Sequence, residues 1–104
     1  MSLVFKALAD PTRRQVLQML RAGPMGAGAL ADAFDVSKPT MSAHFAVLVA
    51  ADLIEAEKSG RTIMYRLKMS VLEDALMGFA QAFGLQVTPE TPATTARSRA
   101  KEKS

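Results

Sequence analysis

The chain has 104 residues, of which 49% are apolar and none is cysteine. This length supplies a modest hydrophobic core for one small domain, and we expect no second domain. The lack of cysteine excludes a disulfide framework and a thiolate metal site, and no apolar run is long enough for a signal sequence or a membrane span. We therefore expect a cytoplasmic protein without stable membrane insertion.

The net charge of +3 and the pI near 9.6 are typical of nucleic-acid-binding proteins, but the basic excess is shared unevenly. Residues 85–104 hold four basic and two acidic side chains, whereas residues 1–84 hold nine basic and eight acidic ones. We expect residues 1–84 to form the folded domain. The remainder is rich in Thr, Pro and Ala, and we expect 85–104 to be a disordered basic tail.

The first two predicted helices meet at Asp10. Residues 3–9 are apolar nearly all the way round, so a helix there needs cover on more than one face. Asp10 is placed as the N-cap of a second helix over 11–22. Arg13 lies at the edge of the buried face of that helix, where it could bond an acidic group or a carbonyl, or could contact a phosphate. The predicted buried stripe is Val16, Leu17 and Leu20.

A third and a fourth helix follow, joined by a tight turn. Residues 26–34 form the third, with Leu30, Ala31 and Phe34 inward and no strong N-cap. Ser37 is a good N-cap for the fourth, which we expect to end at Asp52, a residue type that tolerates the left-handed conformation. Two short helices joined in this way are a candidate helix-turn-helix.

The helix after Ser37 has a narrow apolar stripe, formed by Met41, Phe45 and Leu48 at helical spacing. A helix anchored on one side and slim on the other fits a DNA major groove, which is about 12 Å wide. An ordinary surface helix is the alternative. The residues predicted to face outward are small or polar: Lys38, Thr40, Ser42, Ala43, Ala46, Val47 and Ala50.

The hydrophobic period then changes from 3.6 to 2. Residues 53–57 and 62–67 are predicted strands, joined by a hairpin tip over residues 58–61. The tip contains a glycine, which a hairpin needs, and two cations, which a purely structural hairpin does not. We therefore interpret Arg61 as a phosphate contact, while for Lys58 a structural role remains open.

The last predicted helix spans residues 70–84, with Ser70 as its cap and Gly84 as its stop. Its apolar residues exceed one core-facing stripe, and together with the first helix they indicate a shared surface. The two terminal helices could cover only each other, but for so small a domain we favour a homodimer. The predicted interface comprises Leu3, Val4, Phe5, Leu72, Leu76, Phe79 and Phe83.

This order of elements is that of a winged helix-turn-helix, a mainly α fold of about five helices with a two-stranded antiparallel β-hairpin wing (α+β). Residues 5–14 (Phe-Lys-Ala-Leu-Ala-Asp-Pro-Thr-Arg-Arg), residues 37–45 (Ser-Lys-Pro-Thr-Met-Ser-Ala-His-Phe), Gly60-Arg61 and Tyr65-Arg66-Leu67 together resemble the ArsR family of bacterial transcriptional repressors, and most closely its Sdp-type autorepressor branch. The resemblance covers roughly residues 3–84.

The resemblance implies a dimeric repressor that binds a near-palindromic operator in double-stranded DNA, often upstream of its own gene. Its two recognition helices would reach successive major grooves about 34 Å apart. A protein or small-molecule inducer would release it, and the sequence does not identify one. The candidate DNA-binding residues are Ser37, Lys38, Thr40, Ser42, Ala43, His44, Lys58 and Arg61.

Neither a metal site nor a cofactor is expected. Members of the family that sense metals through thiolates have cysteines where this chain has Met25–Leu30. Members with a metal site on the terminal helix need histidines beside the carboxylates, and here Glu73 and Asp74 have no histidine partner. The single histidine, His44, is either a groove contact or a half-buried hydrogen-bonding residue. No catalytic constellation indicates an enzyme. The alternative function is a protein-interaction winged helix that no longer reads DNA, suggested by the outward Ala43, Ala46, Val47 and Ala50.

Overall fold

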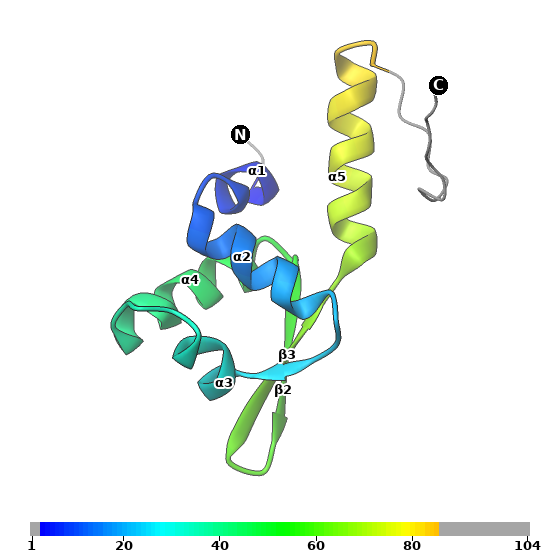
Figure 1. Ribbon diagram of the computed structural model, residues 1–104. Helices are drawn as coiled ribbons and strands as arrows, with labels where there is room; N and C mark the ends of the chain where they lie inside the picture. Colours follow the sequence, from blue (N-terminus) through cyan, green and yellow to red (C-terminus); the bar gives the residue numbers. More distant parts are fainter. Residues whose placement is uncertain (1–2, 86–104) are drawn as a thin grey trace, which may run out of the picture.

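The computed structural model describes residues 3–85, and within them five helices and three strands follow one another (Figure 1). This architecture is the predicted winged helix-turn-helix. The tail predicted over 85–104 lies outside the described residues except for Leu85. The elements are α1 (Leu3–Leu8), α2 (Pro11–Leu20), β1 (Met25–Gly26), α3 (Ala27–Asp32), α4 (Lys38–Ala50), β2 (Ile54–Ser59), β3 (Thr62–Leu67) and α5 (Met69–Ala82).

Asp10 sets the junction between α1 and α2, as predicted. Its Oδ1 accepts the N–H of Thr12 at 2.8 Å and that of Arg13 at 3.1 Å, so two of the free N–H donors at the start of α2 are satisfied. Pro11 follows in the first turn, where its missing N–H costs no helix bond. A short local motif therefore fixes where α2 begins.

The core lies where α2, α3 and α4 meet the inner ends of the strands. The predicted stripes of α2 and α4 are both buried, and the rings of Phe45 and Tyr65 pack with their centroids 4.7 Å apart. Val47 was predicted to face outward, and this is wrong: it is half-buried and packs against the core. The largest fully buried side chains are Val16, Leu30, Met41, Leu48, Leu53 and Ile54.

The sheet has a third strand that the sequence analysis missed. Met25 and Gly26 were predicted near the start of a helix, but they pair antiparallel with Tyr65 and Met64 in the strand order β1-β3-β2. Gly26 is the N-cap of α3, is extended, and makes no side-chain cap bond. Because this helix start lacks a capping side chain, pairing with β3 satisfies backbone groups that would otherwise stay open.

The wing hairpin is tighter than predicted. Its strands extend to Ser59 and Thr62, so the turn itself contains only Gly60 and Arg61. Gly60 has φ +63°, the left-handed conformation that such two-residue turns require. Lys58 is consequently a residue of β2, opposite Ile63, and the prediction that it lies in the hairpin tip is wrong.

The last helix begins at Met69, and Ser70 is not its cap. Lys68 occupies the N-cap position without a side-chain cap bond, because an ammonium has no acceptor for the free helix N–H groups; it donates instead to Asp52 Oδ1 at 2.8 Å. Asp52 has φ +63°, which confirms the predicted left-handed end of α4. Gly84 has φ +71° and ends α5 as predicted, and the later turns of α5 extend away from the rest of the fold (Figure 1).

The N-cap predicts an acid-sensitive contribution to stability. Replacing Asp10 with alanine should lower the free energy of unfolding at pH 7 by about 1 kcal/mol, measured by urea denaturation. Burial acts to raise the pKa of Asp10, but the bonds from the Arg13 and Thr12 N–H groups outweigh it, and the pKa lies below its ordinary 3.8. The contribution of the Asp10 charge to the free energy of unfolding is therefore complete above pH 3.8. It is lost as the pH falls through the lower pKa that Asp10 has in the folded state.

The matched control is Asp10→Asn, which keeps an oxygen acceptor but has no charge to titrate. It should retain most of the stability at pH 7 and show less stability loss in acid than the native chain. Equal stability of the native chain and the Asp10→Ala variant at pH 7 would contradict this role for Asp10.

Candidate nucleic-acid interface

The exposed side of α4 starts from a well-defined cap. Ser37 Oγ accepts the N–H of Thr40 at 3.2 Å and donates its own proton to Thr40 Oγ1 at 2.9 Å. Both hydroxyls stay exposed while they hold each other in place. The first turn of α4 thus presents two hydroxyl groups in a fixed arrangement.

The rest of that side is composed of small or flexible side chains. The predicted contacts Lys38, Ser42 and Ala43 are all exposed, whereas the opposite stripe of α4 is buried in the core. No bulky side chain therefore separates the backbone of α4 from an approaching surface at these positions. This shape is suited to a groove of about 12 Å.

His44 is half-buried, and its Nδ1 lies 3.1 Å from Nη1 of Arg13. An arginine side chain has only donors, so Nδ1 must accept and the neutral ring carries its proton on Nε2. The prediction left open a groove contact or a hydrogen-bonding residue. The structure shows the hydrogen bond, and within residues 3–85 no hydrogen bond to Nε2 is found.

Arg13 has the structural role that its position in the sequence indicated. Its Nε donates to the carbonyl of Ala7 at 2.8 Å and its Nη2 to that of Lys6 at 3.2 Å. One guanidinium therefore joins the last turn of α1 to His44 on α4. The bond to His44 was not predicted, because the two residues are 31 positions apart and no local pattern marks the pair.

The exposed cations of the wing differ in whether an ion pair holds them. Arg61 stands in the turn, and no ion pair to it is found in the described part of the chain. Arg66, by contrast, is held by Glu57 at 3.2 Å across the hairpin. Lys58 is exposed on β2. The structure thus leaves Arg61 as a cation at the end of the wing that is available for an external anion.

The residues of the predicted dimer interface fall into two groups. Val4 and Leu72 are partly buried against the core. Phe5, Phe79 and Phe83 instead form a line of rings from α1 along α5, with centroids 5.2 and 4.8 Å apart, and Phe83 is 69% exposed. We call this surface the aromatic face; it comprises the half-buried Phe5 and the exposed Leu3, Leu76, Phe79 and Phe83.

Comparison with known proteins agrees with this geometry. A helix-turn-helix domain model matches residues 8–57. The transcriptional repressor SdpR of Bacillus subtilis is 43% identical over 76 residues, which are 73% of this chain and 84% of SdpR. The crystal structure of an ArsR family transcriptional regulator, RHA00566, superposes with a TM-score of 0.67 at 31% identity over 82% of this chain and 91% of that one.

The chain belongs to the ArsR family of DNA-binding transcriptional repressors. An ArsR-like regulator from Rhodococcus sp. RHA1 is also similar, with a TM-score of 0.68 and 33% identity over 79% of this chain and 76% of that one. Membership of the ArsR family confirms that the chain is not an enzyme. It also makes α3 and α4 the two helices of the helix-turn-helix.

Within residues 3–85, no three His, Cys, Asp or Glu side chains are grouped so that they could hold a metal ion. None of the described helices combines the length and apolar character needed to cross a membrane.

The hydrogen bond from Arg13 predicts which ring nitrogen of His44 carries the proton. In the native chain, ¹⁵N NMR at pH 8 should show His44 with its proton on Nε2. In Arg13→Lys, the compact ammonium cannot span the positions that Nε, Nη1 and Nη2 of the guanidinium reach, so the two tautomers of His44 should mix and the free energy of unfolding should fall by about 2 kcal/mol.

The neighbouring Arg14→Lys variant is the control, because the Arg14 side chain is exposed and donates to the Leu8 carbonyl, at 2.7 Å, rather than to His44. It should leave the His44 spectrum unchanged. An unaltered tautomer in Arg13→Lys would show that Arg13 does not orient the ring.

Proposed function

We propose that this ArsR-family repressor acts as a homodimer on a near-palindromic operator, with α4 of each protomer in the major groove. The observation that supports this most directly is the contrast between the two sides of α4: the stripe of Met41, Phe45 and Leu48 is buried, and the exposed side is composed mainly of small or polar groups, with Val49 near its end as the exception. An ordinary surface helix does not need so slim an outer side. The repressor would work in the cytoplasm, where operator DNA is found.

The contacts divide by chemistry. The hydroxyls of Ser37, Thr40 and Ser42 can bond base edges or phosphates, and the Ala43 methyl can pack on a thymine methyl. Lys38 and Arg61 supply charges to phosphates on either side of the groove. His44 offers its Nε2–H from the flank of α4. Lys58, exposed on β2, adds a cation along the wing.

A second copy of the chain is the occupant we propose for the aromatic face. This face is apolar, continuous from α1 to α5, and placed on the part of α5 that extends from the fold (Figure 1). Exposed apolar patches of this kind mark interfaces. A two-fold pairing there would also place two recognition helices on one DNA face, as a palindromic operator demands.

Regulation of the protein's own gene is the simplest choice of operator, as in autorepressors of this type. The test is fluorescence anisotropy with duplex DNA from upstream of the gene and with a scrambled duplex, each at two salt concentrations. Binding to the native sequence should be at least about a thousandfold tighter, equal to about 4 kcal/mol. Equal weak binding to both would instead favour a protein partner on the exposed Ala46, Val49 and Ala50.

Arg61 should contribute equally to the affinity for every DNA sequence. The Arg61→Ala variant removes one phosphate contact per protomer, so affinity should fall for both native and scrambled DNA, and the slope of log K against log salt should shrink by about 0.9 for each contact. Arg21→Ala is the control, since Arg21 is exposed at the C-cap of α2, outside the proposed interface. Unchanged affinity in Arg61→Ala would remove the wing from the proposed interface.

The aromatic face predicts a change of oligomeric state. Phe79 is 47% exposed, so Phe79→Glu should fold, with an unchanged helical circular dichroism signal, but sediment as a monomer. A charge buried unpaired in the interface accounts for the loss of the dimer. Val49→Glu, an exposed apolar residue outside the aromatic face, should stay dimeric. A native chain that sediments as a monomer at micromolar concentration would overturn the dimer.

A further inference from the structure

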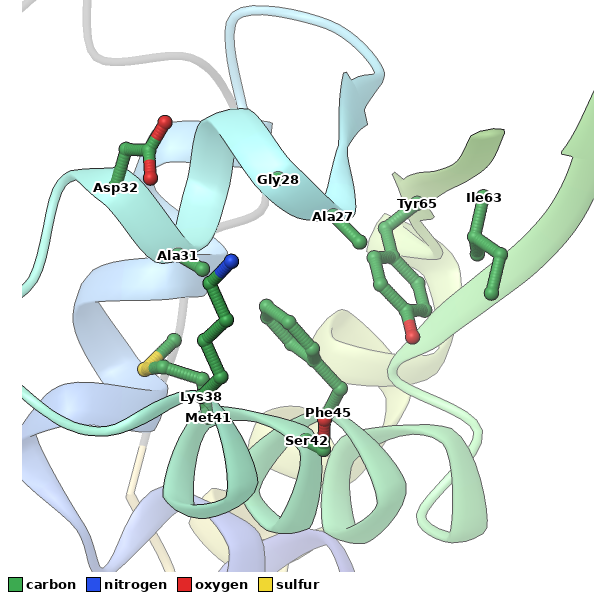
Figure 2. Close-up of a pocket in the computed structure, with 10 residues that line it drawn as sticks. All are labelled: Ala27, Gly28, Ala31, Asp32, Lys38, Met41, Ser42, Phe45, Ile63 and Tyr65. Carbon is green, nitrogen blue, oxygen red and sulfur yellow. The ribbon is translucent and has the colours of Figure 1, made fainter. Parts of the chain in front are cut away.

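A cavity of about 350 Å³ lies between α3, α4 and β3, on the flank of the proposed recognition helix (Figure 2). Ala27, Gly28 and Ala31 of α3 form one side, and Phe45 and Tyr65 form part of the other. The cavity is open because α3 has only small side chains there, and a Cβ placed on Gly28 would meet no atom within 4 Å. Small-molecule pockets begin at about 300 Å³, so the space suits a compound of one or two rings.

The Tyr65 hydroxyl is the first sign of a ligand. Tyr65 is only 9% exposed, and no hydrogen bond to its hydroxyl is found within residues 3–85. Figure 2 shows this hydroxyl directed from β3 toward α4. Burial raises the pKa of the phenol, so the group stays protonated and can donate. Buried hydroxyls normally have partners, and here the cavity is where a partner would sit.

A second donor lines the cavity at another point. The Lys38 ammonium extends from the start of α4 toward α3 (Figure 2), and in the described part of the chain it has no ion-pair partner. Asp32 also lines the cavity, but it lies at the end far from Tyr65 and makes no ion pair with Lys38. Between the phenol and the ammonium, the Phe45 ring and the small side chains of α3 leave a space that accommodates a flat ring with polar groups at both ends.

We propose that this cavity binds a hydroxylated aromatic carboxylate. The ring packs against Phe45 and the small residues of α3, the carboxylate pairs with Lys38, and the ring hydroxyl bonds Tyr65. Lys38 is also a proposed phosphate contact. When a bound carboxylate pairs with Lys38, this cation is no longer available to a DNA phosphate. The compound is thus an inducer, a step that rests on the proposed function.

The site is tested without DNA, by calorimetric titration of the full chain with 6-hydroxy-2-naphthoate. Tyr65→Phe should weaken this probe about tenfold and leave 2-naphthoate, which lacks the hydroxyl, unchanged. Lys38→Gln should weaken both carboxylates about tenfold and leave 2-naphthol unchanged. Lys6→Gln, the same charge change at an exposed position of α1, should bind all three like the native chain.

A cavity-filling variant keeps the test independent of folding. Gly28→Leu places a side chain in open space and replaces glycine with a better helix former, so the chain should fold and lose the probe. Native-like binding of the probe by Gly28→Leu, or no binding by the native chain at millimolar probe, would overturn the site.

Release of DNA is measured separately, by anisotropy of a labelled duplex with increasing probe. The probe should lower the affinity of the native chain for DNA at least about tenfold and have no effect on Gly28→Leu. Binding of the probe without any loss of DNA affinity would overturn the inducer role. A chain that binds the probe but binds no DNA would overturn the proposed function and leave the site standing.

Discussion

The burial of one narrow stripe of α4 is the constraint on which the other features depend. Met41, Phe45 and Leu48 fill the centre of the core, and Phe45 packs on Tyr65 of the wing strand. Since these contacts hold α4 on its inner side, its outer side needs no bulky residue for stability. The helix can therefore be anchored firmly and still be slim where DNA approaches, and the same ring pair fixes the wing beside it.

Arg13 adds a polar connection that the apolar core cannot supply. Its guanidinium uses carbonyls at the end of α1 and the imidazole of His44, so three helices share one set of hydrogen bonds. α1 carries part of the aromatic face, and α4 carries the proposed DNA contacts. A change in how two protomers pack through α1 would therefore reach His44 through a single side chain. This connection gives the proposed dimer a physical route to the proposed DNA-binding side.

The features that were predictable from sequence are those with a local cause. The caps at Asp10 and Ser37, the left-handed Asp52 and the stop at Gly84 each depend on a few neighbouring residues. The buried stripes were equally readable, because helical spacing alone defines them. The errors arose where distant residues decide. Met25 pairs with Tyr65, 40 positions away, and Lys68 uses its side chain on Asp52, so neither β1 nor the start of α5 is visible locally.

The site was predictable to the same degree. The exposure of the small residues of α4 follows from its stripe, but the orientation of His44 depends on Arg13 and could not be derived. The cavity is likewise a long-range product. It needs small residues on α3, the Phe45 ring on α4 and a phenol on β3 to converge, and each of these has an ordinary structural explanation when considered alone.

Small side chains thus have two consequences at the same place. On α4 they allow close approach to a groove, and on α3 they leave a hollow directly beside it. Lys38 lies between the two, exposed to the outer side and lining the cavity. Because a single ammonium cannot be fully used by a phosphate and by a carboxylate at once, the free energy of one contact is lost when the other forms. A recognition helix with so few cations is correspondingly sensitive to the loss of one.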